Sequence, residues 1–345
     1  MQSGLLRSND GAAQLALERT SLMQRKDVNG DLGKSRRIRH PLQKCDKLKK
    51  TLSLLLLALP GLLYLLINNY IPMAGIFIAF KKIDYVKGIF QSDWVGLRNF
   101  KFLFQTDAAW IIIRNTVLYN LVFIVVGNLL AIALAIFMSE IVNRFAAKFF
   151  QTSLLLPNLV SMVVVSYLVY ALLSTENGLI NKQILERIGT DGVQWYANDK
   201  YWPFILVLVY SWKTAGYSSV VYIGSIAGID KQIFEAARID GAGKMAQIFR
   251  ITLPLLKPTI IIMVLMMVGK IFTTDFGLFY QVPMNSGALF PATQTIDTYV
   301  YRALMNSNDI AKSSAAGLFQ SVLGFAFVLF ANGFVRKKSP ENALF

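Results

Sequence analysis

Cysteine and histidine are nearly absent from this sequence. Its 345 residues contain one cysteine, Cys45, and one histidine, His40. A single cysteine cannot form an internal disulfide, and a single histidine excludes zinc sites that need paired histidines. We therefore expect no metal site, and we interpret both residues as surface positions of an N-terminal tail.

A nucleotide-binding loop is also lacking. The stretch 30–35 (GDLGKS) ends like a P-loop, but that motif needs four residues between its glycines and this stretch has two. No strand pattern precedes it, and no carboxylates or histidines cluster within an apolar run. We therefore expect no catalytic residues, no cofactor bound to this chain, and a role other than that of an enzyme.

Charge is scarce and unevenly placed. Charged residues make up 16% of the sequence and hydrophobic residues 54%, a balance unlike that of soluble domains. The net charge is +15, and residues 1–50 alone carry 12 Lys or Arg against 5 Asp or Glu. Most of the remaining excess flanks apolar runs, where basic residues mark membrane orientation. We therefore expect contact with membrane lipid and no nucleic-acid partner.

Long apolar runs dominate the rest of the chain. A membrane-spanning helix needs about 20 apolar residues. The predicted spans are Thr51–Met73, Thr116–Met138, Ser153–Leu173, Trp202–Ile223, Leu255–Phe276 and Ala315–Val335. The sequence thus predicts an all-α, polytopic membrane protein with about six transmembrane helices.

Basic residues in the short connections predict its orientation. The N-terminal arm, Arg144 with Lys148, the loop 230–257 and the run 336–338 fall on one side if six spans alternate. That side should be the cytoplasm, so both termini are predicted to be cytoplasmic, although the nominally external loop after the first span also carries lysines. The predicted organisation is a basic arm (1–50), a first span with an external loop (51–110), a membrane core (111–335) and a cytoplasmic tail (336–345).

The longest predicted cytoplasmic loop, 231–258, lies between the fourth and fifth spans. Its apolar residues favour two short amphipathic helices. Gly241 and Gly243 mark the turn between them, because glycine adopts backbone angles that other residues avoid. Pro254 is expected to begin the next span, where its missing N–H costs nothing.

This loop resembles the EAA loop of bacterial ABC import permeases, whose pattern is E-A-A-x3-G-x9-I-x-L-P. Every fixed position is met without an insertion, by Glu235, Ala236, Ala237, Gly241, Ile251, Leu253 and Pro254. The alternative is an ordinary amphipathic linker, which would have no reason to match seven fixed positions within 20 residues.

The resemblance implies that the loop forms a coupling helix, which docks on a cytoplasmic ATPase. The candidate coupling residues are Phe234, Glu235, Ala236, Ala237, Ile239, Asp240, Gly241, Phe249, Leu253 and Pro254. Apolar members such as Phe234, Ile239 and Phe249 would fill a groove on the partner. The acidic members would pair with basic residues and set the register of docking.

Softer motifs extend the resemblance over roughly residues 52–335. The stretches 70–82 (YIPMAGIFIAFKK), 94–104 (WVGLRNFKFLF) and 114–116 (RNT) are similar to early segments of carbohydrate-uptake permeases, especially those for oligosaccharides and polysaccharide fragments. The resemblance implies a type I ABC importer permease fold in a bacterial cell membrane. The partners that it implies are a second permease subunit in a heterodimer, two ATPase subunits that hold ATP and Mg, and an extracytoplasmic solute-binding protein.

In related permeases the sugar contacts come from the spans on either side of this loop. The corresponding candidates for the substrate path are Trp212, Lys213, Tyr217, Lys270, Phe272, Thr273, Thr274 and Asp275. Aromatic faces and hydrogen-bonding groups suit a sugar, and charges at membrane depth usually face a cavity or a partner. Packing between helices, or a position at the outer interface, is the alternative for each. We expect Tyr217 and residues 272–275 to lie at one depth on adjacent helices.

Other functions stay open on sequence alone. They are an ABC import permease for a non-sugar solute, a stand-alone secondary carrier and a membrane-embedded transferase. A carrier would be expected to contain an internal repeat and interrupted spans, and no repeat is visible.

Overall fold

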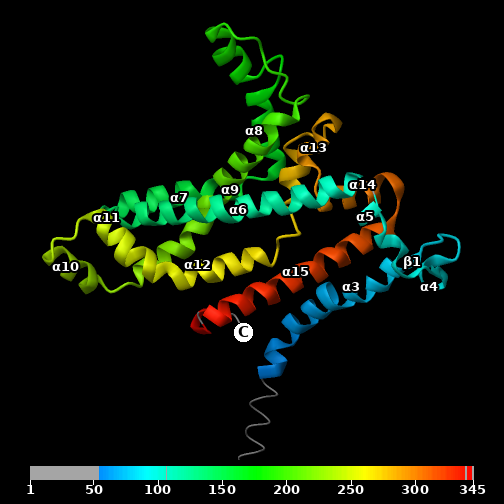
Figure 1. Ribbon diagram of the computed structural model, residues 1–345, viewed down its shortest axis with the longest axis horizontal. Coiled ribbons are helices and arrows are strands. Elements are labelled where there is room, and N and C mark those ends of the chain that lie inside the picture. Colours follow the sequence, from blue (N-terminus) through cyan, green and yellow to red (C-terminus); the bar gives the residue numbers. More distant parts are fainter. Residues whose placement is uncertain (1–53, 106, 339, 344–345) are drawn as a thin grey trace, which may run out of the picture. The chain divides into compact units, whose positions relative to one another are not determined.

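The computed structural model describes residues 54–105, 107–338 and 340–343 (Figure 1). The predictions on the arm 1–50, with Cys45 and His40, lie outside these residues. The chain divides into two compact units, Met1–Pro72 and Met73–Phe345.

The described part of the first unit is a helix with an apolar surface on every side. It is helical from residue 54 and passes through a π-helical turn, η1 (Leu66–Tyr70), into α3 (Ile71–Met73). The full apolar stretch Leu54–Phe80 has a mean hydropathy of 1.9 and buries none of its most apolar window. A helix that is apolar all round needs lipid or other helices around it.

Among the described residues, five helices are long and apolar enough to cross a membrane, and there are six if a bent pair of helices counts as one span. The five are Leu54–Phe80, Ala109–Ser139, Asp199–Ala227, Lys244–Val268 and Ile310–Lys337. The pair is α7 (Arg144–Leu159) with α8 (Met162–Leu173). The prediction of an all-α fold with about six membrane helices is confirmed.

The third predicted span, Ser153–Leu173, is broken by a sharp bend. The axes of α7 and α8 differ by 94°, and Val160 and Ser161 form the α7–α8 break between them. The Ser161 hydroxyl accepts a hydrogen bond from the Val164 N–H at 3.4 Å, so Ser161 caps the start of a new helix. In Figure 1, α8 turns away from the line of α7.

The prediction that the fifth span reaches Phe276 is wrong. The helix α12 (Leu253–Val268) ends before Gly269, and the chain then turns into η8 (Gly277–Gln281). The apolar run continues past the helix end because Ile271 and Phe272 enter a buried cluster with residues of other segments. Residues after Val268 are therefore apolar because they are buried in the protein, and the sequence prediction took them for residues that face lipid.

The remaining elements are short, apart from three long helices. The long ones are α6 (Asp107–Ser139), α9 (Trp202–Ala227) and α15 (Ile310–Lys338). The short helices are η2 (Ala74–Phe80), α4 (Gly88–Gln91), η3 (Gly96–Phe100), α5 (Phe102–Gln105), η4 (Ile180–Leu185), η5 (Glu186–Ile188), η6 (Asp199–Tyr201), η9 (Gly287–Leu289), α13 (Phe290–Thr293), α14 (Ile296–Ser307) and η10 (Pro340–Asn342). A two-residue hairpin pairs β1 (Lys81–Lys82) with β2 (Asp93–Trp94), with Lys81 opposite Trp94.

The core lies where α6 and α9 pack along each other. Trp202 and Leu206 of α9 are fully buried there, and the rings of Phe123 and Tyr210 stack with centroids 3.8 Å apart. Because these contacts are among the largest in the second unit, α6 and α9 form its central pair.

Polar side chains of α6 fix the segment that follows α12. Asn120 donates to the carbonyls of Ile271 and Thr273 at 3.0 and 3.1 Å. Asn115 donates to the carbonyls of Pro291 and Gln294, each at 3.0 Å. These amide groups satisfy carbonyls of an irregular segment that a bilayer could not solvate.

Candidate functional site

The loop between α9 and α12 forms a short helix with defined ends. This helix, α10 (Lys231–Ile239), begins at Asp230, whose carboxylate accepts from the Gln232 N–H at 2.9 Å. It ends at Gly241, which has a φ of +80°, and the Ala242 N–H donates to the Ala237 carbonyl at 2.8 Å. A glycine in the left-handed region is the common way to stop a helix.

The second helix of the loop is continuous with the following span. It comprises α11 (Lys244–Gln247) and a π-helical turn, η7 (Ile248–Thr252), before α12 begins at Leu253. The two predicted helices and the turn at Gly241 and Gly243 are therefore present. Pro254 lies in the first turn of α12, as predicted.

The helix α10 presents apolar side chains that no described part of the chain buries. None of its nine residues is buried, and Ile239 is 87% exposed. In Figure 1, α10 projects beyond the ends of α6 and α12. An amphipathic helix that is uncovered and held at both ends has the form of a docking element.

The predicted coupling residues do not all face the same way. Ile239 and Phe249 are strongly exposed, and Glu235, Ala236 and Asp240 are exposed as well. Phe234 and Ala237 are half-buried. Phe234 lines a cavity of about 420 Å³ between α10 and the ends of α6 and α9. Phe234 therefore seats α10 on its own chain, while Ile239 and Phe249 are available to a partner.

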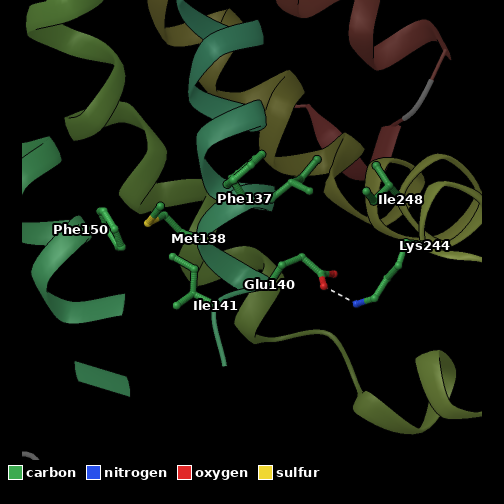
Figure 2. Close-up of a pocket in the computed structure, with 8 residues that line it drawn as sticks. Phe137, Met138, Glu140, Ile141, Phe150, Lys244 and Ile248 are labelled. Carbon is green, nitrogen blue, oxygen red and sulfur yellow. Dashed lines mark hydrogen bonds and ion pairs between the residues drawn. The ribbon is translucent and has the colours of Figure 1, made fainter. Parts of the chain in front are cut away.

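An ion pair ties the same loop to the end of α6. Lys244 at the start of α11 bonds to Glu140, just after α6 (Figure 2). Beside this pair lies a largely apolar cavity of about 580 Å³, lined by residues such as Phe137, Phe150 and Ile248. The loop is thus joined to three long helices: α9 and α12 through the chain, and α6 through Glu140.

The structure separates the candidates for the substrate path into two sets. Exposed members are Trp212, Tyr217, Lys270, Thr273 and Asp275. Buried members are Lys213, Phe272 and Thr274. No hydrogen bond, ion pair or ring contact among the described residues joins Tyr217 to the stretch 272–275. The expectation that 272–275 would continue a helix beside Tyr217 is wrong, because α12 ends at Val268.

Lys213 makes backbone contacts that use all its donors. It is 9% exposed and donates to the carbonyls of Pro157 at 3.2 Å, Asn158 at 3.1 Å and Val160. An ammonium group has three N–H donors, so in this conformation none is left for a sugar.

Thr274 belongs to a polar network that the sequence did not indicate. Its hydroxyl donates to Asp297 at 2.8 Å and lies 2.9 Å from the hydroxyl of Thr295, from which it can accept. Gln320 of α15 donates to the other oxygen of Asp297 at 3.2 Å. This network joins the segment after α12 to α14 and α15, and a search for apolar runs passes over it because its members are scattered.

The sequence did not indicate a role for Arg302 of α14 either. Its Nε donates to Asn285 at 2.9 Å, and its Cζ lies 4.0 Å from the ring centroid of Phe290. Burial lowers the pKa of this guanidinium. A cation over an aromatic face is stabilised by the ring quadrupole, so Arg302 holds the 285–290 turn against α14.

These features define a multi-pass helical membrane protein with an exposed amphipathic helix between two of its spans. The chain belongs to the family described as the binding-protein-dependent transport system inner membrane component, which matches residues 127–340. The predicted identity, a permease subunit of ABC-type import systems, is confirmed.

Relatives with assigned names agree with this membership. The polygalacturonan/rhamnogalacturonan transport system permease protein YteP of Bacillus subtilis (strain 168) is 32% identical over 289 residues, 84% of this chain and 89% of the relative. Protein LplB of the same organism is 30% identical over 298 residues, 86% of this chain and 92% of the relative.

Solved structures agree as well. A chain of a bacterial ABC transporter for import of the acidic polysaccharide alginate superposes with a TM-score of 0.77 at 30% identity, covering 86% of this chain and 99% of that chain. The same kind of transporter, in complex with a periplasmic protein that holds an alginate pentasaccharide, gives 0.76 at 30% identity, covering 85% and 97%.

Proposed function

We propose that this chain is the permease subunit of an ATP-driven importer that passes an oligosaccharide or polysaccharide fragment across the membrane. An external solute-binding protein delivers the sugar, a second permease subunit completes the path, and two ATPase subunits hydrolyse ATP bound with Mg. The chain itself catalyses no reaction. It forms part of the path for the sugar and transmits movement of the ATPase subunits to the membrane spans.

The observation that carries the proposal is the exposed helix α10. Ile239 and Phe249 expose 87% and 65% of their surface, and they lie in a loop that is connected to α6, α9 and α12. Large apolar groups without cover mark an interaction site. An ATPase groove that receives them would move α9 and α12 directly when the ATPases close, as alternating access requires.

The docking role is tested by changing Ile239 and Phe249 together to Asp, and separately by changing Gly241 to Asp. A carboxylate without a partner in an apolar groove costs several kcal/mol, so we expect the chain to insert normally but to co-purify with less ATPase. Gly241→Asp also forces a side chain into a left-handed conformation. The matched control is Lys182→Gln, an exposed change outside the loop. Unchanged co-purification and transport would remove the loop from the account.

The substrate class rests on the relatives. YteP is named for polygalacturonan and rhamnogalacturonan, a further relative is named for arabinooligosaccharides, and the structural neighbours import alginate. We infer that this chain handles a saccharide fragment and that the exposed Tyr217 and Asp275 lie along its path. A non-sugar solute is the second candidate, and transport of a panel of solutes decides between them.

The path is tested with Tyr217→Ala and Asp275→Ala, compared with Tyr217→Phe. If the aromatic face binds a sugar, Tyr217→Ala and Asp275→Ala should each lower uptake at least fivefold, a loss of about 1 kcal/mol of binding, while Tyr217→Phe keeps most of it. Co-purification with the ATPase subunits should not change in any of the three. Normal uptake by both alanine variants would exclude these side chains from the path.

A further inference from the structure

The α7–α8 break lies against α9, which precedes the coupling loop (231–258), and against the start of η8, which follows α12. A Cβ at Gly216 of α9 would lie 1.9 Å from the carbonyl oxygen of Leu154 in α7. A Cβ at Gly277, at the start of η8, would lie 2.7 Å from the Cβ of Met162 in α8. Both glycines therefore allow a close approach that other residues would prevent. The segment before the loop touches one half of the bent span, and the segment after α12 touches the other.

Lys213 binds the end of α7 at this break. Its acceptors are the carbonyls of Pro157, Asn158 and Val160. The last carbonyls of a helix have no partner within the helix and carry its negative dipole. A buried ammonium group with three donors therefore matches the end of α7 in both hydrogen bonding and charge.

These contacts exist only while the span is bent. In a continuous α-helix the Pro157 carbonyl would accept from the Ser161 N–H, and the Asn158 carbonyl from the Met162 N–H. Lys213 takes the place of these intrahelical donors. None of the ion pairs found among the described residues includes Lys213. If α7 and α8 became one straight helix, the ammonium group of Lys213 would lose its acceptors. An unpaired charge is costly at membrane depth.

The break is also mechanically connected to α10. Lys213 and Ala227 lie on the same helix, α9, which runs unbroken from Trp202 to Ala227. At 1.5 Å per residue, Lys213 is about 21 Å from the helix end, and only three residues separate Ala227 from α10. A movement of α10 that shifts the end of α9 is therefore carried to the end of α7 by one continuous helix.

We propose that Lys213 is a positioning residue for transport, which holds the third span bent and carries movement of α10 along α9 to the α7–α8 break. The inference rests on the proposed docking of ATPase subunits on α10. It replaces the expectation that Lys213 contacts the sugar.

The test uses the full complex of this chain with its second permease and ATPase subunits in proteoliposomes. Spin labels are placed at Phe149 of α7 and Tyr167 of α8, which are 62% and 63% exposed, in a Cys45→Ser background. The distance between the labels is measured with and without ATP. We expect it to change with ATP in the otherwise unchanged chain.

Two variants remove the contact to different degrees. Lys213→Met keeps the length of the side chain but has no donor, and we expect uptake to fall at least tenfold, with the ATPase subunits still bound and the label distance insensitive to ATP. Lys213→Gln keeps two donors without charge, and we expect a loss of about threefold in uptake. The matched control is Ser219→Ala, a buried change on α9 whose hydroxyl bonds to the Gly216 carbonyl within the same helix, and it should behave like the unchanged chain.

Any other outcome of these measurements would contradict the proposal. Normal uptake and a normal ATP-dependent distance change in Lys213→Met would overturn it. A loss of uptake that only follows the loss of assembled complex would mean that Lys213 stabilises the fold and transmits nothing, and so would failure of both variants to assemble. If the Ile239 and Phe249 change also leaves transport intact, the docking of ATPases on α10 is wrong. If that change abolishes transport while Lys213→Met is normal, the role of Lys213 alone is wrong.

Discussion

Single residues show where sequence reasoning succeeds and where it stops. The seven fixed positions of the coupling loop were found because their spacing is local, within 20 residues. Lys213 was found as a residue that matters, but its partners could not be, because they are carbonyls more than 50 positions away that are exposed only by a bend in another span. Nothing in the apolar run 153–173 predicts a 94° turn, since Pro157 alone is tolerated in membrane helices.

Gly216 is the residue at which the packing of α9 against α7 can be tested separately from charge. With the Leu154 carbonyl 1.9 Å from the position of an added Cβ, Gly216→Ala forces the helices apart, and overpacking of this kind costs about 1–3 kcal/mol. We expect a clearly lower melting temperature of the detergent-solubilised chain.

The matched control is Gly224→Ala on the same helix, where an added Cβ meets nothing within 4 Å. There alanine should be neutral or stabilising by up to about 1 kcal/mol, because it is the better helix former. Equal melting temperatures for the two variants would mean that α9 and α7 are not held in this close contact.

The membrane spans could be predicted in number and in kind, with errors at their ends. The length of the apolar runs predicted the long helices, because a helix that faces lipid must be apolar over about 20 residues. The same rule failed at Leu255–Phe276 and left α13 and α14 unpredicted, because residues such as Ile271, Ile296 and Phe272 are apolar for burial within the protein. Hydropathy measures removal from water and does not distinguish lipid from a protein core.

The predicted orientation concerns whole elements and has a direct test. If α10 is cytoplasmic, a cysteine at Ile239 should react with a membrane-impermeant reagent only after the cells are permeabilised. A cysteine at Ile188, in the loop between α8 and α9, should react in intact cells, since six alternating spans put it outside. Both positions are well exposed, at 87% and 72%, so reactivity reports the side of the membrane. The reverse pattern would invert the topology and separate α10 from the ATPases.

At the largest scale, the loop 231–258 joins the long helices of the second unit. The helix before it, α9, reaches α7 at Gly216, the segment after α12 reaches α8 at Gly277, and the Glu140–Lys244 pair connects the loop to α6 (Figure 2). Family membership could be predicted from the loop alone, because seven residues at fixed spacing sufficed. The identity of the sugar could not be predicted, because the path that we propose is completed by a second subunit, so this chain contains only part of it.

The central claim is that this chain transports only as part of an ATP-driven complex. The most direct measurement is uptake into proteoliposomes of labelled galacturonate, arabinose and alginate oligosaccharides, with the chain alone and with its second permease, ATPase subunits and solute-binding protein. We predict uptake of at least one of these sugars that requires internal ATP and every partner, and none by the chain alone. Uptake by the chain alone, without ATP, would contradict the account and identify a self-sufficient carrier.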